Sequence, residues 1–359
     1  MRRIASKYAR PGMVLGRAVY DSSGLLVYQR NTTLDENNLS HLMAYGVGEI
    51  LIEDPRVDDV PVQPLIAPEL EGEAIQALRQ LMAEGQGKGN IERSLLEDAA
   101  KPIYAMTRNL FPDVMGEPNA SGCLSLDAFN YVQPVKAAGL ALLIGKRLGY
   151  GLVELADLGI AALLMNIGYL KLPSKTIHDT ESLNEEEARE FHRHSRYGYE
   201  ILTEQARFGP AVAEAVLQHH ERWDGLGIPS GIKGSDICTF ARILCIADAY
   251  YDLVSSRPCR KALIPHEAVE FIMAYSDEFF DPELVQIFAR QVPLYPTGVS
   301  VKLNTGEVCI VSDANLGHVG RPVVRVCYDE NQTAVNSPYD VDLSRIENQS
   351  RLVVQVLEY

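Results

Sequence analysis

The sequence predicts a mainly α-helical protein, with a small α/β segment before the helices and a small β unit after them. From residue 124 to residue 290, nearly every segment places apolar residues at helical spacing. Before residue 66, short apolar runs alternate with turn residues, which is typical of short strands. After Tyr295, β-type runs alternate with polar turns such as residues 304–306. These three observations divide the chain into an N-terminal α/β segment, a helical region and a C-terminal β unit.

Composition narrows the classes of function. The chain has 359 residues, of which 47% are hydrophobic and 23% are charged, as in ordinary globular proteins. Its formal charge of −15 argues against a general nucleic-acid binder, because phosphate backbones need a basic face. The six cysteines form no CxxC pair, which is typical of reduced thiols in the cytosol. We expect a cytoplasmic protein without a membrane span, since the best apolar stretch, near residues 158–165, is too short to cross a bilayer.

The N-terminal α/β segment is expected to span residues 1–66. Its expected elements are a hairpin turn at 21–24, a returning strand at 25–28, a helix at 34–45 and a strand at 49–52. Thr33 and Asp35 are the candidate caps for the helix. Three prolines between residues 60 and 68 indicate a linker.

Residues 67–122 are expected to hold the end of this linker and two connecting helices, at about 69–84 and 92–110. The helical domain follows over residues 123–295. Its expected helices cover residues 135–148, 152–164, 185–202, 210–218, 237–254 and 264–275. The C-terminal β unit is expected over residues 296–359. Its expected strands lie at residues 299–303, 307–311, 322–328 and 352–357.

The densest cluster of chemically active side chains lies at residues 219–231. Two adjacent histidines, His219 and His220, end a predicted helix, and the glycine-rich loop that follows permits the chain to bend there. His194 lies on an upstream helix. Asp248 is a lone carboxylate in an apolar helix, which is unfavourable unless it is paired, hydrogen-bonded or bound to a metal. Three histidines and an aspartate are a chemically reasonable metal-binding set.

Four sequence runs resemble the HD-GYP family, the bacterial branch of the HD phosphohydrolases that hydrolyses cyclic di-GMP. They are HSRYGYEIL, HHERWDGLGIPSGIKG, ARILCIADAYYDLVSSRPCRKAL and FFDPELV, in the family's order and spacing. The resemblance covers residues 124–295 and implies an all-helical HD-GYP-type bundle. The run PTGVSVKLNTGEVCIVSD after it is similar to tails that follow such domains.

The same resemblance shows which family residues are replaced. The HDIGK stretch of the family is MNIGY here, and the Glu and His of its first helix align with Phe and Gln. The degenerate positions are Phe129, Gln133, Met165, Asn166 and Tyr169. The Tyr of the GYP signature is Ile228. Phe offers no ligand, Met is a poor substitute for imidazole, and Asn lacks the charge that bridges two metals. We therefore expect no catalytic residues, because a two-metal centre would have lost four ligands.

The retained residues imply a remnant of the metal site. By the resemblance, His194, His219 and His220 group around one metal, while Asp248 belongs to its neighbour. Three histidines with an open position suit a single zinc or iron ion. The alternative, which we favour, is that no cofactor binds and the histidines are hydrogen-bonded parts of the scaffold.

The stretch at residues 257–261 resembles the family's RPYRK run, whose basic residues face the dinucleotide phosphates. Arg257 and Arg260 are the matching positions. Arginine forks suit phosphate oxygens, although a solvated basic turn is an equal alternative. Asp252 falls four residues after Asp248 and is expected to cap a helix or pair with an arginine.

Three hypotheses follow. The favoured one is a catalytically inactive HD-GYP signalling protein that binds cyclic di-GMP or a protein partner such as a diguanylate cyclase. The alternative is a divergent metal-dependent phosphodiesterase that hydrolyses cyclic di-GMP with a reduced metal site. The third is a purely structural module whose pocket is filled by Phe129, Met165 and Tyr169.

Overall fold

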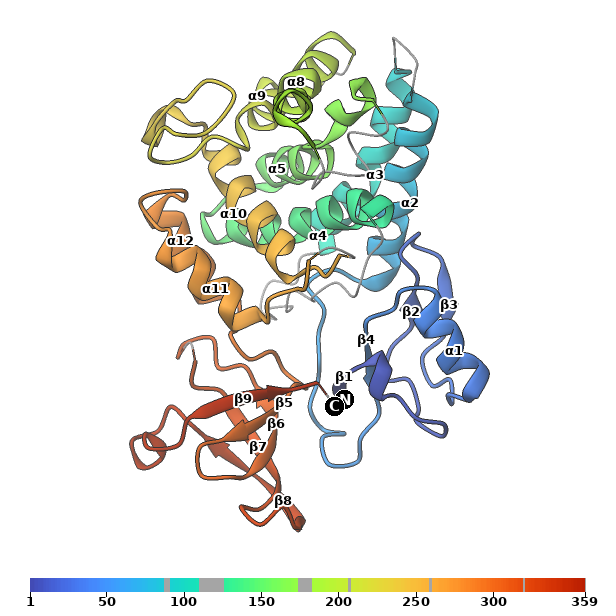
Figure 1. The fold of residues 1–359 in the computed structure, drawn as a ribbon, viewed down its shortest axis with the longest axis vertical. Coiled ribbons are helices and arrows are strands. Elements are labelled where there is room, and N and C mark those ends of the chain that lie inside the picture. The colour runs from blue at the N-terminus through green and yellow to red at the C-terminus, as the bar shows by residue number, and fades with distance from the viewer. Residues whose placement is uncertain are drawn as a thin grey trace.

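The computed structural model describes residues 1–86, 91–109, 126–173, 183–205, 208–257, 260–318 and 320–358. Figure 1 shows a helical body above two small units, one built from the N-terminal residues and one from the C-terminal residues. The prediction of a mainly α-helical fold with a small N-terminal α/β segment and a small C-terminal sheet is confirmed.

The N-terminal unit contains two pairs of antiparallel strands and one helix. Its elements are β1 (Arg2–Ala5), η1 (Ser6–Tyr8), β2 (Val19–Tyr20), β3 (Leu26–Tyr28), α1 (Glu36–Ala44) and β4 (Glu49–Ile52). β1 pairs with β4, and β2 pairs with β3. Of the two candidate caps, Asp35 is the one that caps α1, because its side chain accepts a hydrogen bond from the Asn38 amide at 2.7 Å. The strand β1 was not predicted, since it is short and half of its residues are arginine.

The helical body is built around α4 and α5, against which α3, α9 and α10 pack. Its elements are α2 (Pro68–Gly85), α3 (Arg93–Asn109), α4 (Leu126–Arg147), α5 (Leu152–Leu164), η2 (Ile167–Lys171), α7 (Glu185–Phe191), α8 (His194–Gln205), α9 (Pro210–Gln218), η3 (Gly234–Asp236), α10 (Thr239–Val254), α11 (Pro265–Ala274) and α12 (Pro282–Gln291). The two helices expected as connectors, α2 and α3, share the hydrophobic core of the body.

The helix expected over residues 185–202 is two helices, so that prediction was wrong in one respect. α7 ends at Phe191 and α8 begins at His194. The break lets the Nδ1 atom of His194 reach the carbonyl oxygen of Phe191 at 2.8 Å. Apolar periodicity continued through the break and concealed it.

Among the described residues, one stretch, residues 152–171, is long and apolar enough to cross a membrane by length and composition. It is longer than the apolar stretch expected from the sequence. However, 72% of its most apolar window is buried inside the protein, and α5 ends at Leu164 before η2 begins. Its apolar residues pack against α3, α4 and α9, as expected of a core helix.

The C-terminal unit is a five-stranded antiparallel sheet in the order β8-β7-β6-β5-β9. Its elements are β5 (Ser300–Leu303), β6 (Val308–Asp313), β7 (Val323–Tyr328), β8 (Ala334–Asp342), η4 (Ile346–Asn348) and β9 (Val353–Leu357). β8 was not predicted. It is an edge strand with mostly exposed residues and Pro338 in its middle, and prolines are tolerated at sheet edges.

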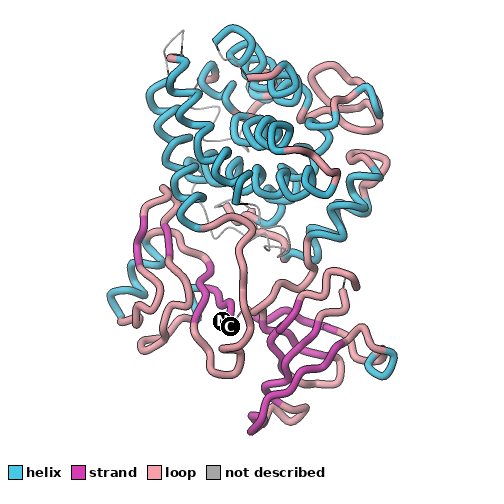
Figure 2. Tube along the Cα trace, turned by 180° about the vertical axis from the view of Figure 1, so that it is seen from behind, coloured by secondary structure: helices cyan, strands magenta, loops and turns pink. Residues whose placement is uncertain are grey.

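The two small units form one base beneath the helical body. The amide of Arg3 donates to the Gly298 carbonyl at 2.9 Å, and that of Ala5 donates to Glu358 at 2.8 Å. Val57 and Val60, which follow β4, pack against β6 and β7 in a small buried cluster. Figure 2 shows the two ends of the chain next to each other at this joint.

Candidate metal site and phosphate-facing edge

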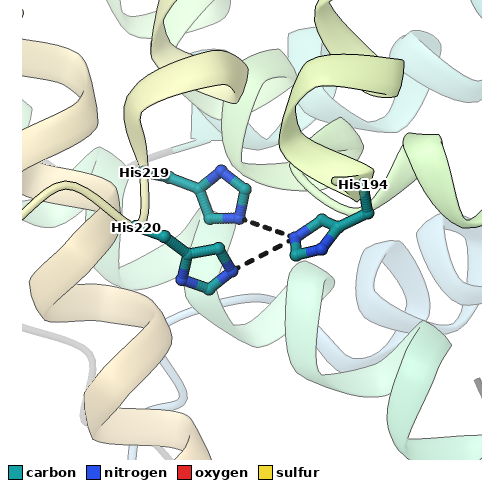
Figure 3. Close-up of side chains that lie close together, drawn as sticks. All are labelled: His194, His219 and His220. Atoms are coloured by element: carbon teal, nitrogen blue, oxygen red, sulfur yellow. Dashed lines mark hydrogen bonds between the residues drawn. The ribbon is translucent and has the colours of Figure 1, made fainter. Parts of the chain in front are cut away.

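The structure brings His194, His219 and His220 together, from the start of α8 and the end of α9 (Figure 3). His194 and His219 are buried, and His220 is partly buried. The Nε2 atom of His194 lies 3.4 Å from that of His219 and 3.1 Å from that of His220. One ligand atom from each ring falls within 4.8 Å of the others, as a shared ion would require.

The hydrogen bonds of the rings define which nitrogen carries the proton. The Nδ1 atom of His194 is 2.8 Å from the Phe191 carbonyl oxygen, and that of His219 is 2.7 Å from the Val216 carbonyl oxygen. Because a carbonyl oxygen only accepts, each Nδ1 must donate, and each Nε2 then presents a lone pair.

These two lone pairs face each other without a proton between them. Burial lowers the pKa of His194 and of His219 to about 3, so both rings are neutral near pH 7. Burial also holds the pKa of His220 well below its usual range. A cation between the Nε2 atoms would be bound by both lone pairs, and backbone bonds at Nδ1 are the usual outer support of histidine ligands. The residues present therefore fit a transition-metal ion.

Close backbone packing positions His194. η2 contacts α8 at Gly168, where an added Cβ would overlap the His194 carbonyl oxygen and come within 2.7 Å of the Gly198 amide nitrogen. Only glycine permits this approach. The rings of Tyr169 and Phe191 then lie 4.9 and 5.4 Å from the His194 ring.

A tightly bonded loop follows His220. The buried carboxylate of Glu221 accepts hydrogen bonds from the amides of Ser230 at 2.7 Å and Gly231 at 3.0 Å. The amide of Ile228 donates to the His220 carbonyl at 3.1 Å. The loop thereby fixes the backbone at His220. The role of Glu221 was missed by sequence reasoning, although a Glu directly after the histidine pair was a visible signal.

Asp248 does not join the three histidines in a common group among the described residues. Its Oδ1 accepts a short hydrogen bond from the Nε2 of Gln133 on α4. Burial raises the pKa of Asp248 to about 7, and the negative charge of Asp252 adds to the shift. The Gln133 amide thus occupies one acceptor oxygen of the Asp248 carboxylate.

The structure also describes three other positions that the resemblance expects to be degenerate, Met165, Asn166 and Phe129. Met165 is fully buried, and Asn166 joins α5 to η2, where its carbonyl accepts from the Tyr169 amide at 2.9 Å. Phe129 lies one helical turn before Gln133 on α4 and is partly buried. Its ring stacks under the Arg257 guanidinium, 4.3 Å from ring centre to Cζ.

Both expected phosphate-facing arginines bind a carboxylate of the chain itself. Asp252 pairs with Arg257 at 2.5 Å and with Arg260 at 2.6 Å, which confirms that it pairs with arginine. The Nε of Arg257 is buried with no hydrogen-bond partner among the described residues. Residues 258–259, between the two arginines, lie outside the described residues. Arg257 and Arg260 therefore form a basic edge, but their charges are paired with the carboxylate of Asp252 in the same chain.

Comparisons with known proteins agree with this architecture. The sequence profile described as HD domain matches residues 91–284, and the one described as KOW domain associated with HD domain matches residues 300–358. A cyclic di-GMP phosphodiesterase of Pseudomonas aeruginosa is 28% identical over 67% of this chain and 59% of its own. The cyclic di-GMP phosphodiesterase response regulator RpfG of Xanthomonas campestris is 35% identical over 42% of this chain and 40% of its own. This chain thus spans less than two thirds of either relative.

A solved structure supports the fold independently. A protein of Bdellovibrio bacteriovorus, described as an HDG"Y"P protein, superposes with a TM-score of 0.50 at 15% identity, over 80% of this chain and 97% of its own. Because the HD domain profile matches more than half of the chain, the family resemblance predicted from the sequence is confirmed, and the chain belongs to the HD domain family.

Proposed function

We propose that this protein is an HD-GYP-type signalling protein that has lost two-metal hydrolysis and acts in the cytoplasm by binding. The observation that carries the proposal is the hydrogen bond from Gln133 to Asp248. Two-metal phosphodiester cleavage needs free carboxylates that clamp both ions. Here the neutral side-chain amide of Gln133 is hydrogen-bonded to the Asp248 carboxylate. In addition, Met165 and Asn166 stand where the resemblance expects a histidine and an aspartate.

In this proposal His194, His219 and His220 hold at most one ion. Such an ion, when bound, would supply a fixed positive charge for a phosphate oxygen or a water. The chain itself supplies the neutral Nε2 ligands, the buried surroundings and the loop that fixes His220. HD domains are metal-dependent, and this donor set is what remains of that property in this chain.

Metal analysis tests the site. We expect purified protein loaded with Zn²⁺ or Fe²⁺ to retain about one ion per chain, as expected for one three-histidine site, and His219→Ala to retain none. His192→Ala is the matched control, because His192 is a neighbouring histidine outside the group. Metal retention in His219→Ala equal to wild type would contradict the site.

Hydrolysis and binding assays test the function. The relatives' names make cyclic di-GMP the substrate to examine. We expect no hydrolysis above background in the metal-loaded protein, and turnover that disappears in His219→Ala would instead establish the divergent phosphodiesterase. That second candidate is favoured only by the convergence of the three Nε2 atoms.

Calorimetry separates nucleotide sensing from protein binding. Micromolar binding of cyclic di-GMP that is lost in Arg257→Ala/Arg260→Ala, but kept in the exposed control Arg345→Ala, supports sensing at the basic edge. Asp252→Asn should tighten that binding, because it releases both guanidinium groups. An absence of binding in wild type and in Asp252→Asn would leave a protein partner, such as a diguanylate cyclase, as the ligand class.

A further inference from the structure

We propose that Tyr169 is a positioning residue for the three-histidine site, where its ring fixes the orientation of the His194 imidazole. The inference rests on the proposed function, because it concerns how the proposed ion site is held in shape. It assigns a role to a residue that stands where the resemblance expects a lysine.

Three rings meet at this position. The Tyr169 ring centre is 4.9 Å from that of His194 and 5.5 Å from that of Phe191, and the Phe191 and His194 centres are 5.4 Å apart. Each ring therefore contacts the other two. Phe191 also accepts the Nδ1 hydrogen bond of His194 through its carbonyl oxygen. The imidazole is thus held by one hydrogen bond and by two tilted aromatic rings.

This arrangement determines which nitrogen faces the other histidines. A flip of the His194 ring would break the bond to Phe191 and turn Nε2 away from His219 and His220. The two aromatic walls oppose rotation of the ring, because tightly packed rings leave no room for another rotamer. Fixed orientation of a histidine ligand by outer contacts is a general source of metal affinity.

The charge of Tyr169 also suits the site. Three neutral histidines leave the double positive charge of an ion uncompensated, so a neighbouring cation would oppose binding. A tyrosine side chain is neutral near pH 7, unlike the lysine that the resemblance expects at this position. A neutral aromatic ring therefore gives orientation without repulsion.

The alternative is that Tyr169 only fills space, since it also packs in a small cluster with Leu172 and Met82. Tyr197 allows the two roles to be separated. It belongs to the same cluster and lies on α8, but its hydroxyl donates to Glu190 at 2.7 Å, and it makes no ring contact with His194 among the described residues. Tyr197→Leu is therefore the matched control.

The first test is titration with Co²⁺, followed by its visible absorption, which reports ligand geometry. We expect Tyr169→Phe to bind like wild type, and Tyr169→Leu to bind about 10- to 100-fold more weakly with an altered spectrum, the usual effect of losing an outer support. Phe191→Leu should weaken binding in the same direction, and it serves if Tyr169→Leu does not fold. Unchanged affinity in Tyr169→Leu or Phe191→Leu, or an equal loss in Tyr197→Leu, would overturn the proposal.

A second readout needs no metal. In the metal-free protein, ¹⁵N NMR of the imidazoles should show His194 with its proton on Nδ1 in wild type and in Tyr169→Phe, and a mixture of tautomers in Tyr169→Leu. If wild type binds no Co²⁺, the ion site of the proposed function fails, while the tautomer comparison still decides the role of Tyr169. An unchanged tautomer in Tyr169→Leu would refute that role.

Discussion

The partly buried carboxylate of Asp248 should destabilise the folded protein at neutral and alkaline pH, so removal of its charge should be stabilising there. The pKa of Asp248 is raised to about 7 in the folded state, against about 3.9 for an ordinary aspartate. Between about pH 4 and pH 7, the Asp248 carboxyl therefore keeps its proton in the folded chain and has lost it in the unfolded chain. Its stability falls as pH rises from about 4, and the loss is complete above about pH 7.

The size of this effect follows from the shift. Three pKa units correspond to about 4 kcal/mol, and partial solvent access of Asp248 reduces our expectation to about 1–3 kcal/mol. Asp248→Asn keeps the shape of the side chain and removes the charge. Its new amide can donate to Gln133 Oε1, which is buried without a partner among the described residues. We expect Asp248→Asn to be more stable than wild type at pH 8 and nearly equal near pH 4.5.

Urea unfolding at the two pH values, in EDTA, measures the difference. Asp236→Asn is the control for loss of a charge, because Asp236 is exposed. A stability gain of the same size at both pH values would show that packing, and not ionisation, is responsible. A loss of stability at pH 8 would refute the reasoning, since Asp248 would then be ionised and well compensated.

Three further perturbations test the supports of the site and of the base. Gly168→Ala should destabilise the protein by at least about 1–3 kcal/mol in urea unfolding, because the added Cβ overlaps the backbone of His194. Glu221→Ala should cost about 1–3 kcal/mol by the same assay and speed proteolysis of the loop that follows, because two backbone amides lose their acceptor. Val57→Ala should cost about 1.5–3 kcal/mol in thermal unfolding, because Val57 is fully buried between the two small units.

The sequence alone predicted the helical body and the three histidines because these signals are local. Helical periodicity and the contiguous run at residues 219–231 need no knowledge of the fold. The convergence of His194 with that run came from the family resemblance, and the structure shows it as Nε2 contacts. The loss of the four family ligands remains a prediction from the alignment of motifs.

The remaining features depend on contacts between distant residues. Gln133 and Asp248 are 115 residues apart, so nothing in either neighbourhood announces their hydrogen bond. The contact of Tyr169 with His194 depends on how closely η2 approaches α8, which Gly168 determines. β8 escaped prediction because edge strands carry a weak apolar pattern.

The two small units are joined to each other, so the helical body is a long segment of chain whose two ends are held together. Hydrogen bonds of Arg3 and Ala5 with Gly298 and Glu358 hold both ends of that segment at one place. The free-energy cost of closing a flexible loop, which comes from lost chain entropy, grows slowly, by about 0.6 kcal/mol for each doubling of loop length. Surface insertions within the helical body should therefore leave the base almost undisturbed, and length changes there should be tolerated far better than changes in the short segment around Val57.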